Sequence, residues 1–266
     1  MNVPGALQPI HAALLDLDGT LVDSLADLHQ AVNHVLELYG RSPLDRDTVR
    51  GYIGDGVQVL LARSFLGWDE TELDSADFGA SETVPGRETL ERREAARQAA
   101  MRRLLERAAT LRSPSLRDGI EAFRVFYGEH LVDNTCCYPG VVETLERLRS
   151  QKIVCAVVSN KPEGLVKNIV SKLALAPFFA SIVGGDTLPY AKPRPEPALR
   201  ALDEIGAGPQ ETLFVGDSVN DVLCGQNAGC RTAVVTYGLS SSALLEAYKP
   251  GFRLERFSDL PGIVIG

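Results

Sequence analysis

Two carboxylates at the end of an apolar run are the first residues of this chain that could do chemistry. The run 12–15 leads directly into Asp16, and Asp18 follows two residues later, ahead of a Gly19-Thr20 turn. An apolar run bounded by turn residues is typical of a buried strand, and residues two apart lie on the same side of a strand. Like charges held this close repel each other unless a cation lies between them, and carboxylate oxygens are ligands that Mg²⁺ takes. An aspartate can also act as a covalent nucleophile. The alternative interpretation is a strand that ends in an ordinary Asp-Gly turn.

Other polar residues stand at or near the ends of later apolar runs. Ser159 and Asp217 each follow such a run, and Asp221 comes one helical turn after Asp217. Lys192 lies in a loop with prolines on its C-terminal side. Taken singly, Ser159 is explained as a helix cap, Lys192 as a surface lysine and Asp217 as a turn residue. The carboxyl ends of parallel strands meet at one edge of a sheet, so together these residues predict a single site.

The elements that must position these residues follow an α/β pattern. Predicted strands alternate with predicted helices after residue 138; the strands cover 153–158, 181–183, 212–215 and 232–235, and the helices cover 141–149, a segment ending near 173, 195–205 and 220–228. Strands that alternate with helices of this length indicate a Rossmann-like parallel sheet with helices on both faces.

The segment between the first strand and residue 133 differs from the rest. No stretch in it alternates as a strand does, so it is predicted to be all helix, beginning with a helix capped by Ser24 that runs to about Leu38. We therefore predict a split α/β core, residues 1–22 and 134–266, with an all-helical cap domain inserted over 23–133.

Two further helices of the predicted cap flank a glycine-rich loop. A short helix is expected to end at Val49, the stretch 51–56 breaks it, and a helix follows over 57–66. Glycines allow backbone N–H groups to approach an anion closely, which makes this loop a candidate contact for a substrate carboxylate. The alternative interpretation is a flexible helix break.

An arginine-rich insertion, around residues 86–117, stands out in an acidic chain. Residues 87–117 hold nine arginines against four glutamates, a local charge of +5. Apolar residues recur at helical spacing, namely Leu90, Met101, Leu104, Ala108 and Leu111. The spacing predicts an amphipathic helix with a thin apolar seam and a solvated outer face. A subunit interface and a positive patch that steers anionic substrates are the alternatives.

Composition limits the class of protein. The chain has 266 residues, 45% hydrophobic and 23% charged, which fits one or two globular domains with a sizeable core. A net charge of −8 argues against nucleic acid as a partner. No apolar run reaches the roughly 18 residues of a membrane span, and residues 1–11 do not resemble a signal peptide. The five cysteines include no C-x-x-C pair, which predicts reduced thiols in a cytoplasmic protein rather than structural zinc.

Four motifs in this order resemble those of the haloacid dehalogenase superfamily. Asp16-Leu17-Asp18-Gly19-Thr20 is similar to its first motif, Ser159 to its second, Lys192 to its third, and the stretch 216–221 to its fourth. The insertion after the first motif is similar to the superfamily's helical cap of the first type. Further stretches resemble the phosphoglycolate phosphatase family within it, namely 18–24, 50–56, 138–141, 158–162, 184–189 and 214–221. The arginine-rich stretch departs from that pattern.

This resemblance implies a Mg²⁺-dependent phosphomonoester hydrolase that works through an aspartyl-phosphate. It implies that Asp16 is the nucleophile and that Asp18 is the acid and then the base. The implied metal site consists of Asp16, Asp18 through its backbone carbonyl, Asp217 and Asp221. The implied substrate contacts are Ser159, Asn160 and Lys192 in the core and Gly54, Asp55 and Gly56 in the cap, which would close over the site as a lid.

Several readings stay open at this stage. Within enzymes, the phosphate ester could be 2-phosphoglycolate, a sugar phosphate, a nucleotide, pyrophosphate or a muramic acid phosphate. A residue in the place of Asp18 is not needed for a halide leaving group, which disfavours a dehalogenase. A phosphomutase is disfavoured because nothing marks a second transfer partner. The rival from another class is a non-catalytic scaffold that docks through the arginine-rich helix. The expected partner is a small phosphorylated metabolite, with neither nucleic acid nor membrane, and the expected state is a monomer or homodimer.

Overall fold

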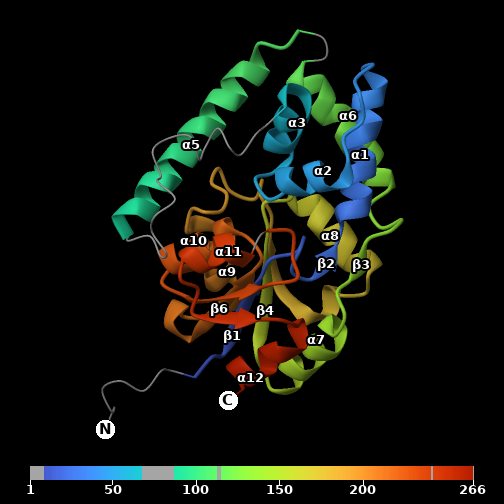
Figure 1. The fold of residues 1–266 in the computed structure, drawn as a ribbon. Helices are drawn as coiled ribbons and strands as arrows, with labels where there is room; N and C mark the ends of the chain where they lie inside the picture. Colours follow the sequence, from blue (N-terminus) through green and yellow to red (C-terminus); the bar gives the residue numbers. More distant parts are fainter. Residues whose placement is uncertain (1–8, 68–86, 113–114, 241, 266) are drawn as a thin grey trace. The chain divides into compact units, whose positions relative to one another are not determined.

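The computed structural model describes residues 9–67, 87–112, 115–240 and 242–265 (Figure 1). The chain divides into two compact units. The first consists of residues 1–24 and 134–266, and the second of residues 25–133. The chain therefore leaves the first unit once, directly after Ser24, and re-enters it at Asn134.

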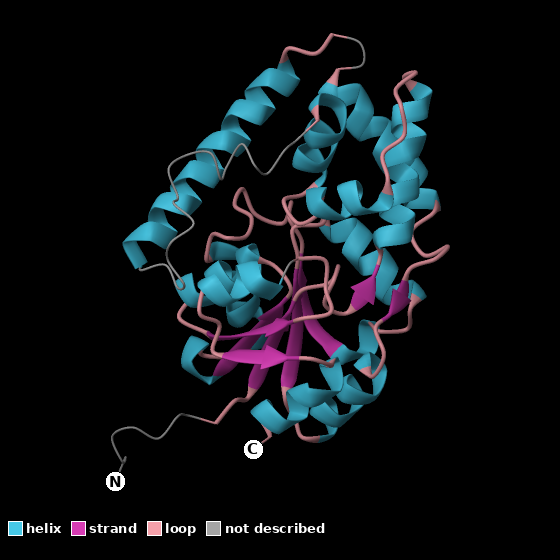
Figure 2. Ribbon diagram, in the orientation of Figure 1, coloured by secondary structure: helices cyan, strands magenta, loops and turns pink. Residues whose placement is uncertain are grey.

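A six-stranded sheet, parallel throughout, forms the centre of the first unit (Figure 2). Its order is β5-β4-β1-β6-β7-β8, and its strands are β1 (Ala12–Leu15), β4 (Val154–Val158), β5 (Phe179–Val183), β6 (Thr212–Gly216), β7 (Arg231–Val235) and β8 (Phe252–Leu254). The chain winds outward from β1 in both directions, to β4 and β5 on one side and to β6, β7 and β8 on the other. Open parallel sheets bind ligands beyond the carboxyl ends of their strands at such a switch point.

Helices cover both faces of this sheet. They are α7 (Val141–Ser150), α8 (Glu163–Lys172), α9 (Glu196–Ile205), α10 (Val219–Asn227), α11 (Ser242–Ala247) and α12 (Leu260–Val264). Leu14 and Phe214 pack with residues of α9 and α10 on one face. The neighbouring Leu15 and Val215 point to the other face and are just as buried, so that face is covered too. The predicted Rossmann-like core is confirmed.

Sequence reasoning missed two small strand elements. One is β8 at the sheet edge, and the other is an antiparallel ribbon of β2 (Val22–Asp23) with β3 (Cys136–Cys137). Two- and three-residue strands are too short to show an alternating pattern. The ribbon joins the two points at which the chain crosses between the units.

The described residues of the second unit form only helices and loops. The helices are α1 (Leu25–Leu38), α2 (Arg46–Tyr52), α3 (Val57–Leu66), α5 (Arg87–Ala109) and α6 (Leu116–Glu129). α2 continues three residues past the predicted end at Val49. Its start is capped by Asp45, whose side chain accepts a hydrogen bond from Thr48 N, and its last turn is anchored by the buried side chain of Tyr52.

The arginine-rich segment forms the long helix α5. Its Leu104 and Ala108 are buried against Val59 and Ala62 of α3, so the predicted apolar seam exists and faces a neighbouring helix. Met101 and Leu111 pack at the margin of this cluster, whereas the side chain of Leu90 lies outside the described part. The helix α6 that follows begins at a capping box in which Ser115 and Asp118 bond each other's backbone N–H groups. Within the described residues, no helix is long and apolar enough to cross a membrane.

Candidate active site

Asp16 and Asp18 lie in the turn that follows β1, at the switch point of the sheet. Asp16 is buried, with 7% of its surface exposed. The chain reverses at Gly19, which has a φ of +85° and whose N–H donates to Val22 O at 2.9 Å. A Cβ at Gly19 would lie 2.2 Å from Asp217 Oδ2, so both the left-handed backbone and the close approach require glycine here.

The ammonium group of Lys192 joins the ends of β1 and β4 to the start of α10. Its Nζ donates to Asp16 Oδ1 at 2.7 Å, to Asp221 Oδ1 at 2.6 Å and to Val158 O at 2.8 Å. The Lys192 side chain is 3% exposed. The interpretation of Lys192 as a surface lysine is therefore wrong, because the lysine is a buried cation between two carboxylates.

Asn160 holds the backbone of Lys192 in place. Its Nδ2 donates to Lys192 O at 3.1 Å and its Oδ1 accepts from Lys192 N at 2.9 Å. Both ends of the amide are used in this way, so the observed role of Asn160 is to position Lys192. Ser159, the preceding residue, is buried at the end of β4, and its Oγ accepts from Lys161 N at 3.3 Å.

Asp217 and Asp221 complete the carboxylate group at the start of α10. Asp221 Oδ2 accepts from Ser218 N at 2.9 Å and Ser218 Oγ at 2.6 Å, which caps the helix and leaves Oδ1 for Lys192. Asp217 Oδ2 accepts from Leu239 N at 2.7 Å. These bonds fix both side chains before any ligand arrives.

The charges of this cluster do not balance. Asp16, Asp217 and Asp221 are buried, and each offers a carboxylate oxygen within 4.8 Å of the other two, against the single ammonium of Lys192. Burial raises the pKa of Asp16 to about 6, against the lowering effect of Lys192, with Asp221 raising it further. Burial, followed by the charges of Asp16 and Asp221, raises the pKa of Asp217 well above its ordinary value. Burial alone would lower the pKa of Lys192, but the two carboxylates raise it above its ordinary value.

A divalent cation fits this donor set. Three buried carboxylates with one lysine leave an excess of negative charge, which a hard cation with oxygen ligands relieves. Of the predicted ligands, the structure brings together the side chains of Asp16, Asp217 and Asp221. The Asp18 side chain points to different partners, and its contribution to the metal site through the backbone carbonyl stays a prediction.

Those partners of Asp18 include a residue that sequence reasoning missed. Lys161 Nζ donates to Asp18 Oδ1 at 2.6 Å, and Ser24 Oγ donates to the same oxygen. The Lys161 side chain is 6% exposed. A signal for it was present, because Lys161 stands two residues after Ser159 at the same strand end.

The predicted cap residues Gly54, Asp55 and Gly56 belong to the second unit. Gly54 and Gly56 have φ values of +116° and +85°. The Asp55 carboxylate pairs with Arg63 at 2.8 Å and with Arg97 of the arginine-rich helix. Arg97 also pairs with Glu94 at 3.6 Å, so the two guanidinium groups are balanced by two carboxylates and Asp55 is held in place within the second unit.

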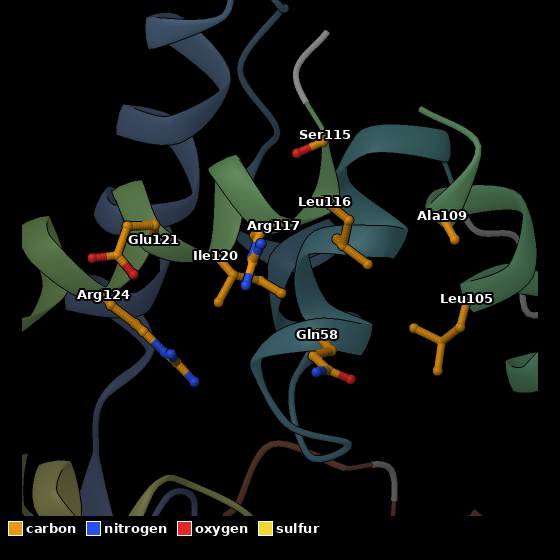
Figure 3. Close-up of a pocket in the computed structure, with 9 residues that line it drawn as sticks. All are labelled: Gln58, Leu105, Ala109, Ser115, Leu116, Arg117, Ile120, Glu121 and Arg124. Atoms are coloured by element: carbon orange, nitrogen blue, oxygen red, sulfur yellow. The ribbon is translucent and has the colours of Figure 1, made fainter. Parts of the chain in front are cut away.

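A cavity of about 670 Å³ lies within the second unit, between α3, α5 and α6 (Figure 3). Its lining residues are Gln58, Leu105, Ala109, Ser115, Leu116, Arg117, Ile120, Glu121 and Arg124. None of the predicted site residues is among them, so the cavity is separate from the carboxylate cluster.

Comparison with known proteins identifies the family. The model of the haloacid dehalogenase-like hydrolases matches residues 13–235, which include all four motifs. The chain is a haloacid dehalogenase-like hydrolase. The resemblance predicted from the sequence motifs is thus confirmed.

Several relatives within this family are named phosphoglycolate phosphatases. The chain is 34% identical to a phosphoglycolate phosphatase of Chromobacterium violaceum over 91% of both proteins. It is also 34% identical to phosphoglycolate phosphatase 1 of Pseudomonas aeruginosa, over 93% of this chain and 77% of that protein. A crystal structure of a predicted phosphoglycolate phosphatase from Haemophilus somnus superposes with a TM-score of 0.76 at 30% identity, covering 97% of this chain and 99% of that one.

Proposed function

We propose that this hydrolase cleaves phosphomonoesters through an aspartyl-phosphate on Asp16, with Mg²⁺ as its cation. The observation that carries the proposal is the cluster at the switch point, where Lys192 joins Asp16 to Asp221 beside the buried Asp217. The cation would be held by Asp16, Asp217, Asp221 and the backbone carbonyl of Asp18. When bound, it neutralises charge on the carboxylates and on the transferring phosphoryl group.

The chain's own residues then perform two transfers. An Asp16 oxygen attacks phosphorus in line while the ester P–O bond breaks, and Asp18 gives its proton to the leaving alcohol. Asp18 next takes a proton from water as the water oxygen attacks phosphorus, which breaks the bond to Asp16 and releases phosphate. Ser159 binds a phosphoryl oxygen and the fixed charge of Lys192 attracts the phosphoryl group, so positioning and charge supply most of the rate enhancement.

Lys192 is suited to hold Asp16 in place because its ammonium group stays protonated. The carboxylates of Asp16 and Asp221 keep the ammonium protonated, and its bond to Val158 O fixes its direction. The lysine therefore orients the Asp16 carboxylate before the substrate binds. This arrangement avoids reorganisation during the reaction.

For the substrate we propose 2-phosphoglycolate. The support comes from the curated relatives named phosphoglycolate phosphatase at 30–34% identity over most of the chain. Gly54, Asp55 and Gly56 would contact the substrate carboxylate, because glycines allow backbone N–H groups to approach an anion closely.

We also infer a cytoplasmic enzyme that acts as a monomer or homodimer on a small metabolite. The support is the set of five free thiols, a composition typical of a reducing compartment.

A substrate panel tests the proposal. Purified enzyme is assayed with 2-phosphoglycolate, sugar phosphates, a nucleoside monophosphate and pyrophosphate, in Mg²⁺ and in EDTA, beside Asp16→Asn. We expect Mg²⁺-dependent turnover that Asp16→Asn abolishes, with 2-phosphoglycolate highest in kcat/KM. A higher kcat/KM for a sugar phosphate would reject the substrate and keep the reaction class. Turnover that survives Asp16→Asn unchanged would reject the nucleophile.

A further inference from the structure

Lys161 is a buried lysine at the core site to which the proposed mechanism assigns no role. It lies at the end of β4 with its side chain 6% exposed, and its Nζ meets Asp18 Oδ1 at 2.6 Å. Lys192 is held by Asp16 and Asp221, so the two lysines serve different carboxylates.

We propose that Lys161 is a positioning residue that orients Asp18 for proton transfer. The inference rests on the proposed function, in which Asp18 is the acid and then the base. Lys161 Nζ and Ser24 Oγ both donate to Oδ1 of this carboxylate. Among the described residues, none hydrogen-bonds Oδ2. Because two donors hold Oδ1, the direction of the carboxylate is fixed and Oδ2 is the oxygen left to meet the leaving alcohol.

The local sequence fixes Lys161 itself. Its N–H donates to Ser159 Oγ at 3.3 Å, and its carbonyl accepts from Gly185 N at 2.8 Å. A Cβ at Gly185 would lie 2.3 Å from Asn160 O, so only glycine permits this approach. The backbone of Lys161 is thus held from two sides, and its buried side chain reaches Asp18 from that anchored position.

Ser24 gives the same carboxylate a second anchor. It is fully buried and is the last residue of the first unit before the chain enters α1. Only the first transfer, from the ester to Asp16, begins with the proton on Asp18: that O–H bond breaks as the leaving alcohol's O–H bond forms. The water step restores the proton to Asp18.

The need for an acid depends on the leaving group, and this gives a specific test. An alkyl alcohol leaves poorly unless it is protonated, whereas p-nitrophenol and acetate leave readily as anions. Correct placement of a general acid contributes about 10²–10⁴-fold to a rate. The ratio kcat/KM reports only the steps up to release of the leaving group, so it isolates the acid step from the later hydrolysis of the intermediate.

The experiment compares Lys161→Met, Lys161→Arg, Ser24→Ala and the control Lys167→Met, whose side chain is exposed and pairs with Glu163. Substrates are 2-phosphoglycolate, p-nitrophenyl phosphate and acetyl phosphate, with Mg²⁺ present. We expect Lys161→Met to lower kcat/KM for 2-phosphoglycolate by about 10²-fold and for the other two by less than about threefold. Lys161→Arg should recover part of the loss, Ser24→Ala should show the same pattern more weakly, and Lys167→Met should match the wild type.

Two results would overturn the inference. One is an equal loss of kcat/KM on all three substrates, which indicates a general structural role. The other is a higher KM for 2-phosphoglycolate with kcat unchanged, which indicates that Lys161 binds the substrate directly. If the wild type itself turns over none of the three, the proposed function fails instead. Should Lys161→Met not fold, Lys161→Arg and Ser24→Ala supply the comparison.

Discussion

Replacing Lys192 with methionine removes the single lysine charge from the carboxylate cluster while keeping much of its volume. In the wild type, the ammonium donates to Asp16, Asp221 and Val158 O at 2.6–2.8 Å. The variant leaves these two carboxylates and the carbonyl without that donor. The repulsion between the two carboxylates then raises the pKa of Asp16 further, beyond the rise that burial already causes.

The cost follows from burial. Removing one partner of a buried ion pair costs about 3–5 kcal/mol, because an uncompensated charge stays inside the protein. The total free energy of unfolding of a domain is about 5–15 kcal/mol, so this loss is a large share of it. At about 2–4 °C per kcal/mol for a chain of this size, Tm should fall by roughly 6–20 °C.

Urea unfolding at pH 7.5 in EDTA, followed by far-ultraviolet circular dichroism, measures this effect. The matched control is Lys167→Met, which removes an exposed ion pair and should cost less than about 1 kcal/mol. Mg²⁺ should raise the Tm of Lys192→Met by more than it raises that of the wild type, because it replaces the missing charge. If the Lys192→Met loss is below about 1 kcal/mol in EDTA, the account of the cluster is wrong.

Three further perturbations probe the electrostatics of the carboxylate cluster and of the Asp55–Arg63 ion pair. Asp217→Asn should raise stability in EDTA by about 0.5–2 kcal/mol and abolish the Mg²⁺-induced rise in Tm, because burial disfavours the Asp217 charge; a loss of stability in EDTA would contradict this. The Mg²⁺-induced rise in Tm should shrink as pH falls through about 6, since the raised pKa of Asp16 lets protons compete with the cation there; a rise independent of pH between 5 and 8 would argue against Asp16 as a ligand. Asp55→Asn should cost about 3–5 kcal/mol in urea unfolding, because the buried Arg63 loses its carboxylate partner, and a cost like that of Lys167→Met would show that the pair is not buried in solution.

Much of the core could be predicted because its patterns are strong. The apolar run 12–15 forms β1 as expected, and α1 ends at the predicted Leu38. Asp16, Ser159, Lys192 and Asp217 stand at or near strand ends, and parallel strands bring their ends to one edge of the sheet. Topology therefore brings Asp16, Ser159 and Asp217 together, whereas Lys192 lies farther along the loop after β5 and is held there by Asn160.

Contacts between side chains could not be predicted in this way. The sequence shows Lys161 at a strand end but not that its ammonium reaches Asp18, since this depends on rotamers and on the approach of Gly185. The sequence likewise shows Asp55 in a glycine-rich loop, but not its pairing with Arg97 from 42 residues away. Short elements such as β8 could not be predicted, because three residues are too few to show an alternating hydrophobic pattern.

Chemical trapping shows whether Asp16 carries the phosphoryl group during turnover. Enzyme turning over 2-phosphoglycolate with Mg²⁺ is quenched and reduced with borohydride, which converts an aspartyl-phosphate to homoserine, and its peptides are sequenced by mass spectrometry. We expect homoserine at position 16 in the presence of substrate and none in its absence. Steady turnover with an intact Asp16, or with homoserine at another aspartate, would contradict it.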